Sequence, residues 1–168
     1  MTDQLQKTLL IGYGNPDRQD DGVAWHILVA VARKINYPLP PAWEEGFVPS
    51  PDQPEIELRF VLQLTPEMSE DLTHFNRVCF IDAHTGRVPE EVHFEQIAPE
   101  MQNSPFTHHL TPAMLVFLTQ SLYSHRLDAA LVSVRGYEFG FSHELSQSTR
   151  DLVSLAVGKI ITWQNISL

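Results

Sequence analysis

The sequence has one cysteine, few basic side chains and no long apolar run. The single cysteine, Cys79, excludes an internal disulfide. Eleven lysines and arginines against 21 acidic residues give a net charge of −10, so neither nucleic acid nor an anionic membrane is an expected partner. No stretch approaches the ~18 apolar residues of a membrane-spanning helix. The first residues also lack the basic region and apolar run of a signal peptide, so the cytoplasm is the expected location.

The composition is that of an ordinary globular protein. With 168 residues, of which 43% are hydrophobic, the chain is long enough for one sizeable core. No internal repeat or linker-like segment divides it. We therefore expect a single domain spanning 1–168, with a monomer as the default oligomeric state.

Strand and helix patterns alternate along the chain. Apolar or alternating segments predict strands at 8–13, 56–62, 78–81, 92–97 and 129–134. Helical spacing of apolar residues, with start signals such as Thr-Pro, predicts helices at 21–34, from 65, from 111 and at 146–164. This order predicts an α/β protein: a three-layer α/β/α sandwich with a mostly parallel five-stranded sheet.

Two of the strands have features of edge strands. The alternation in 56–62 indicates one less covered face. The segment 92–97 follows its predecessor too closely for a helical crossover, so it is predicted to be an antiparallel edge strand.

The proline-rich segment 38–54 has no clear period and is predicted to be a surface loop. Its Trp43 and Phe47 could contact a partner, although packing of the segment against the body is the favoured interpretation.

The segment from Thr8 to Ile27 is the most informative one. Gly12 and Gly14 allow a sharp turn after the first strand, and two carboxylates, Asp20 and Asp21, open the next helix. A dinucleotide site is disfavoured, because the third glycine is missing and two anions would repel a pyrophosphate. One of the two acids can be explained as a helix cap. A pair of acids is better explained by a ligand site at the carboxyl edge of the sheet.

A second carboxylate site and two histidines follow along the chain. Asp82 comes directly after the strand 78–81, in a segment that reads as a turn, and His108 and His109 precede the third helix. Two carboxylates and an imidazole would suit a divalent first-row metal, or acid–base catalysis without metal. Spacing alone does not separate these two hypotheses. Cys79 lies inside the strand and is predicted to be a core residue, with no role as a nucleophile.

The chain resembles the hydrogenase maturation proteases, the endopeptidases that process the large subunit of nickel–iron hydrogenases. The resembling segments are GYGNPDRQDDGV (12–23), LQLTPEMSEDL (62–72), VCFIDA (78–83) and THHLTPAMLVFL (107–118). The segment GYEFGFSHELS (136–146) resembles the subgroup that serves cytoplasmic bidirectional hydrogenases. The departures are Gln19 and Ala24, at positions where the family often has glycine.

The resemblance implies the same three-layer fold, a partner and a site. The implied partner is a large-subunit precursor that already holds nickel, from which the protein removes a C-terminal tail. The residues implied to contact this nickel are Asp21, Asp82 and His108, with His109 as the alternative under a one-residue shift. No tightly held metal of the protein's own is expected. Other functions stay open: a non-catalytic, metal-dependent chaperone of the same precursor, or another small-molecule hydrolase on this fold.

Overall fold

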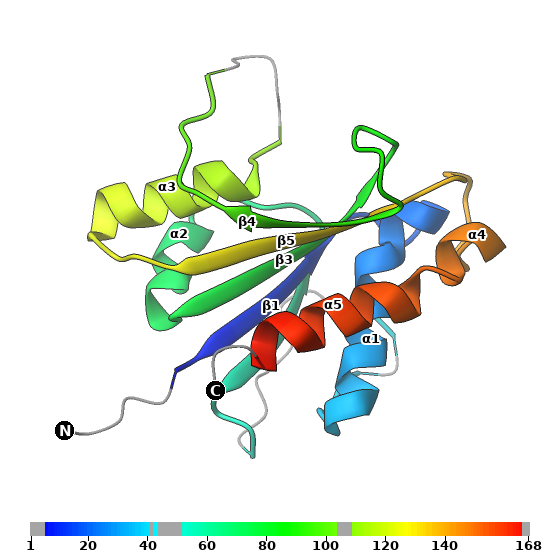
Figure 1. The fold of residues 1–168 in the computed structure, drawn as a ribbon, viewed down its shortest axis with the longest axis horizontal. Helices are drawn as coiled ribbons and strands as arrows, with labels where there is room; N and C mark the ends of the chain where they lie inside the picture. Colours follow the sequence, from blue (N-terminus) through cyan, green and yellow to red (C-terminus); the bar gives the residue numbers. More distant parts are fainter. Residues whose placement is uncertain (1–5, 41, 44–51, 104–108, 166–168) are drawn as a thin grey trace.

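The computed structural model describes residues 6–40, 42–43, 52–103 and 109–165. A five-stranded sheet forms the centre of the fold, in the order β2-β1-β3-β5-β4. Its strands are β1 (Thr8–Tyr13), β2 (Ile56–Val61), β3 (Arg77–His84), β4 (Val92–Ile97) and β5 (Asp128–Arg135). All neighbouring strands are parallel except β4 and β5, which pair antiparallel at one edge (Figure 1). The predicted sheet, with its single antiparallel edge strand, is thus confirmed.

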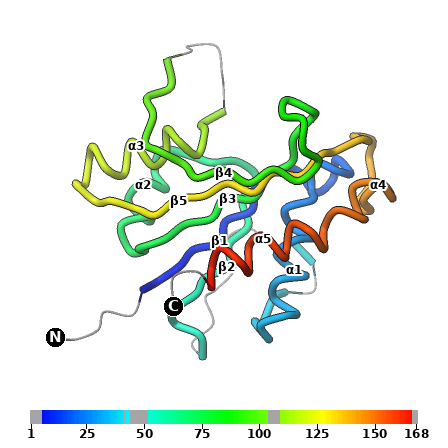
Figure 2. The backbone as a smooth tube through the Cα atoms, viewed as in Figure 1, coloured from blue at the N-terminus to red at the C-terminus, as the bar shows by residue number. Residues whose placement is uncertain are grey.

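Helices cover both faces of the sheet (Figures 1 and 2). On one face, α1 (Val23–Ile35) and α5 (Val153–Asn165) pack against each other and the sheet. On the other face lie α2 (Met68–Asp71) and α3 (Pro112–Tyr123). Short elements complete the fold: η1 (Gln19–Gly22), η2 (Leu72–His74) and α4 (Gln147–Arg150). The three-layer prediction is therefore confirmed.

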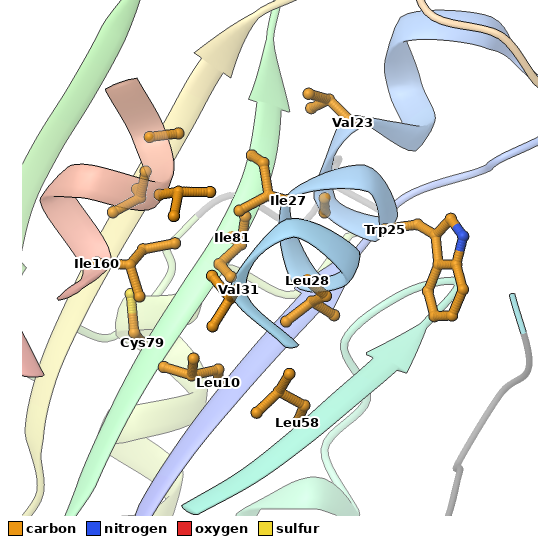
Figure 3. Close-up of a cluster of buried hydrophobic side chains, with 14 of the residues drawn as sticks. Leu10, Val23, Trp25, Ile27, Leu28, Val31, Leu58, Cys79, Ile81 and Ile160 are labelled. Carbon is orange, nitrogen blue, oxygen red and sulfur yellow. The ribbon is translucent and has the colours of Figure 1, made fainter. Parts of the chain in front are cut away.

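Alternation along the strands divides the core in two, because successive strand side chains point to opposite faces. Leu9 and Ile11 face α2 and α3, while Leu10 faces α1 and α5. Figure 3 shows the cluster that contains Leu10, in which side chains of β1, β2 and β3 lie beneath α1. Cys79 belongs to this cluster and is fully buried, and burial raises the pKa of its thiol to about 12. It is the core residue that the sequence predicted.

Two predicted helix starts are confirmed by their capping bonds. The Thr111 hydroxyl accepts a hydrogen bond from Met114 N–H at 3.2 Å, and Pro112 is the first residue of α3. Before α4, the Ser146 hydroxyl accepts a hydrogen bond from Thr149 N–H at 3.3 Å. Each hydroxyl satisfies an amide that the first helical turn leaves without a backbone partner. The predicted closing helix 146–164 is divided into α4 and α5, and the helix predicted from 65 is one turn of α-helix followed by η2.

Three strand predictions need correction. Strand β3 continues to His84, so Asp82 lies inside the strand and not in a turn after it. Strand β2 lies at an edge of the sheet, as its alternation predicted, but both of its faces are covered, because Glu57 is buried and its carboxylate binds Arg59 at 2.6 Å. Strand β4 is antiparallel as predicted, but its neighbour is β5, which lies between β4 and β3.

The described part of the segment 38–54 packs against the body. The Trp43 ring meets the Phe60 ring edge-on, with centroids 6.0 Å apart, and contributes to the core beside α1. Phe47 lies outside the described residues. No helix in the described part of the chain is long and apolar enough to cross a membrane.

The turn after β1 depends on Gly14. Its φ of +140° lies in a region that side-chain-bearing residues rarely adopt, and a Cβ there would lie 2.2 Å from the Asp21 carbonyl oxygen. We expect Gly14→Ala to destabilise the protein by about 2 kcal/mol or more, because both the backbone and the contact are incompatible with alanine. Thermal unfolding measures this effect.

Gly158 provides the matched control. It lies within α5, and a Cβ there would meet no atom within 4 Å. Gly158→Ala should stabilise the protein by about 0.5–1 kcal/mol through helix propensity alone. Equal melting temperatures for the two variants would contradict the close approach of Gly14 to Asp21.

Candidate functional site

A cleft of about 640 Å³ opens at the carboxyl ends of the parallel strands. Asp21 and Asp82 both line it, together with His109. This edge of an open α/β sheet is where ligands bind, because strand ends and the following loops converge there. The structure thus brings both predicted carboxylates into one cleft with one of the two predicted histidines. His108 lies outside the described residues, so its place in the site stays a prediction.

The first loop fixes Asp21 in place. The Asn15 N–H donates to its carboxylate at 3.0 Å, and the backbone of Gly14 passes against its carbonyl. The carboxylate is partly buried and faces the cleft. The turn that begins with Gly14 therefore determines where this acid points.

Among the acids that line the cleft, Asp82 has the most strongly shifted pKa. Burial raises its pKa from 3.8 to about 7, and the negative charge of Asp21 adds to the rise. Hydrogen bonds from Ala83 N–H, at 2.7 Å, and from the Tyr13 side chain act in the opposite direction but do not cancel it. The carboxyl group therefore changes its charge near neutral pH.

Tyr13 was not among the candidate residues from the sequence. It ends β1, lines the cleft and forms a side-chain hydrogen bond with Asp82. Burial, followed by the charge of Asp82, raises the pKa of Tyr13 well above its usual value, so its hydroxyl stays protonated and donates to the carboxylate. The available signal was its position between Gly12 and Gly14, at the end of a central strand.

Asp20, the neighbour of Asp21, has a structural role. Its side chain is fully buried and accepts hydrogen bonds from residues far along the chain. The donors are Tyr137 N–H (2.9 Å), Glu138 N–H (2.8 Å), Ser146 N–H (2.8 Å), Ser146 Oγ (2.7 Å) and Thr149 Oγ1 (2.8 Å). Burial alone would raise the pKa of Asp20, but these hydrogen bonds outweigh it and lower the pKa. Of the two adjacent acids, Asp20 anchors the loop before α4, and Asp21 is left to face the cleft.

Histidines of the cleft wall also differ from the predicted set. His93 of β4 lies in the wall and pairs with Glu90 at 3.3 Å and Glu95 at 3.1 Å. His84 ends β3, where burial lowers its pKa and the Gly86 N–H donates to its Nδ1 at 3.1 Å, so this imidazole is neutral. Within the described ranges, no three His, Cys, Asp or Glu side chains are grouped as a metal site requires.

Solved structures share this fold at low sequence identity. The hydrogenase maturating endopeptidase HybD from E. coli has a TM-score of 0.71 and 15% identity, covering 96% of this chain and 94% of that one. The NiFe hydrogenase maturation protease HybD from Thermococcus kodakarensis has a TM-score of 0.62 and 15% identity, with coverages of 94% and 99%. An uncharacterized protein from Wolinella succinogenes has a TM-score of 0.62 and 19% identity, with coverages of 96% and 99%.

Neither a family model nor a curated protein sequence matches the chain. The structural likeness nevertheless covers nearly the whole of both chains in each of these pairs. This protein therefore has the fold of the hydrogenase maturation endopeptidases.

The division of roles between Asp20 and Asp21 gives a stability prediction. Asp20→Asn should destabilise the protein by about 2–4 kcal/mol, because it removes a charged acceptor from several buried donors. Asp21→Asn should change stability by less than about 1 kcal/mol, because that carboxylate accepts one backbone bond at the cleft surface. Thermal unfolding at pH 7 compares the two.

At low pH, the difference in melting temperature between Asp20→Asn and the wild type should become smaller. A carboxyl group whose folded pKa is lowered stabilises the fold above its unfolded pKa of about 4, and this stabilisation is lost as the pH falls through the folded pKa. The melting-temperature difference should therefore shrink below about pH 4. A difference that is small at pH 7, or that grows in acid, would contradict the anchoring role.

The carboxyl group of Asp82 should affect the pH dependence of stability in the opposite direction. Because its folded pKa is raised, the ionised form destabilises the fold as the pH rises from about 4 towards 7. Asp82→Asn should therefore match the wild type near pH 4 and exceed its stability at pH 8 by about 1–2 kcal/mol. Denaturant unfolding at the two pH values measures this, and a variant that is less stable than the wild type at pH 8 would contradict the assignment.

Proposed function

We propose that this protein is a hydrogenase maturation endopeptidase that removes the C-terminal tail of a nickel-loaded NiFe hydrogenase large-subunit precursor. One observation carries the proposal: Asp21 and Asp82 face a single cleft in the fold of proteins named as hydrogenase maturation endopeptidases. The resemblance of 12–23, 62–72, 78–83 and 107–118 to that family supports it independently. The segment 136–146 is the basis for assigning the chain to the subgroup that serves cytoplasmic bidirectional hydrogenases.

In this proposal the nickel belongs to the substrate. Asp21, Asp82 and His108 contact the metal that the precursor already holds, and His109 is the alternative imidazole. Carboxylate and imidazole ligands complement the cysteine sulfurs of the precursor around a divalent first-row ion. The protein needs no tightly held metal of its own, because its ligands make a weak site until the precursor supplies the rest.

The charge of Asp82 provides a physical basis for selecting a loaded precursor. Without a cation, burial and the neighbouring Asp21 make the ionised carboxylate unfavourable, which is why its pKa is raised to about 7. A nearby positive ion favours the ionised form and removes this penalty. A nickel-loaded precursor therefore gains a favourable interaction that a nickel-free precursor of the same sequence lacks.

Binding of the metal by this cleft would fix the tail of the precursor for cleavage. Water adds to the carbonyl carbon of one peptide bond, the bond to nitrogen breaks, and the released amine takes up a proton. A metal ion can polarise such a carbonyl or position it. A carboxylate of the cleft can take a proton from the attacking water and pass it to the released amine.

The test is a mass measurement on the precursor. Purified protein is incubated with precursor that has or has not been loaded with nickel, and the mass of the large subunit is determined. We expect shortening only in the loaded sample. Asp21→Ala, Asp82→Ala and His108→Ala should each slow processing by more than about 100-fold, because each removes a group that acts on the bound substrate.

Cys79→Ala is the control, because the thiol is fully buried in the core and does not line the cleft. Normal processing by either aspartate variant would show that the site is misassigned. If His109→Ala is inactive and His108→Ala is not, the imidazole belongs to His109. A stable complex with unchanged precursor mass would favour the chaperone alternative.

A further inference from the structure

Two loops join to form a rim beside the cleft, made of residues 15–20 and 137–143. Backbone bonds run between them: Gln19 N–H to Ser142 C=O (2.9 Å), Ser142 N–H to Asp17 C=O (3.3 Å) and Asp20 N–H to Glu138 C=O (3.1 Å). Figure 1 shows the loop before α4 lying beside the start of α1. The rim is continuous with the cleft, because Arg18 forms a bridge with Ser142 and also lines the cleft wall.

The two phenylalanines of this rim differ in exposure, since Phe139 is partly buried and Phe141 is exposed. Phe139 turns inward, and its ring lies where a Cβ on Gly136 would meet it at 2.6 Å, next to the Asp20 side chain. Phe141 is 99% exposed, the most exposed large hydrophobic side chain among the described residues. Single exposed apolar residues are common on protein surfaces, so exposure alone would mean little.

The rigidity of its support sets Phe141 apart. The carboxylate of Asp20 holds the loop from below, and Gly140 N–H donates to the Gln19 side chain at 3.1 Å. Gln19 itself keeps a left-handed backbone with φ of 53°, a conformation that is unfavourable for a residue with a side chain and that the surrounding bonds must maintain. Because these bonds already order the backbone that carries Phe141, a partner that covers the ring need not order the loop.

Exposed acidic residues border Phe141 along the loops of the rim. Asp17, Glu138 and Glu144 belong to or adjoin the rim, and His143 pairs with Asp17 at 2.7 Å. An apolar centre within a polar border is the arrangement of a binding hot spot. The acidic border, on a chain with a net charge of −10, favours a partner pocket edged by basic side chains.

We infer that this rim is a docking surface for the folded body of the large-subunit precursor, with Phe141 as its anchor in an apolar pocket. This inference rests on the proposed function, because the rim adjoins the cleft that would receive the tail. A body docked on the rim would deliver its own C-terminal segment directly past Arg18 and Asp21 into the cleft.

The experiment compares Phe141→Ser with Leu155→Ser, which removes an exposed apolar side chain from α5 (55% exposed). Binding to nickel-loaded precursor and the rate of tail removal are measured for both variants and the wild type. Phe141→Ser should weaken precursor binding by about tenfold or more and raise KM similarly, with kcat unchanged at saturation. Leu155→Ser should bind like the wild type, and both variants should keep its melting temperature.

The outcomes separate this inference from the function itself. If Phe141→Ser binds and processes precursor like the wild type, the docking surface is wrong and the protease function stands. If the wild type neither binds nor shortens the precursor, both fail. If Phe141→Ser changes the protein from dimer to monomer without weakening precursor binding, the rim contacts a second copy of the chain, which also overturns the inference.

Discussion

The buried carboxylate of Asp20 is the interaction on which the site depends. It binds backbone and hydroxyl donors of the segment that leads into α4, and so fastens that segment to the turn after β1. With Asp20 directed into the protein, the next residue, Asp21, is directed into the cleft. The same bonds hold the rim that carries Phe141. One internal acid thus determines both the position of a proposed ligand and the shape of the surface beside it.

The two carboxylates of the cleft repel each other when both are ionised. Asp21 and Asp82 lie close enough for the charge of one to raise the pKa of the other, and burial adds to the effect. Such an arrangement destabilises an empty site and becomes favourable when a cation enters it. Functional sites often retain groups that the fold alone would not favour. In the proposed function, the cation is the nickel of the precursor, which ties recognition of the metal to the instability of the empty cleft.

Much of this architecture follows from patterns that are local in the sequence. Continuous apolar strands alternating with helical periods predicted the three layers, and Asp21 and Asp82 were found because the ends of parallel strands meet at one edge. The partners of Asp20 could not be found in this way, since Ser146 lies 126 residues along the chain. Pairing of β4 with β5 and the ion pair of the buried Glu57 with Lys7 likewise depend on contacts between distant segments, which periodicity does not encode.

The most direct test of the account is the coordination of the nickel. X-ray absorption spectra of the nickel-loaded precursor are recorded alone and in a mixture with the protein frozen before cleavage. We expect additional oxygen or nitrogen ligands in the mixture, and fewer of them when a variant lacking both Asp21 and Asp82 carboxylates replaces the wild type. An unchanged nickel spectrum with a wild-type protein that still shortens the precursor would contradict metal recognition by this cleft.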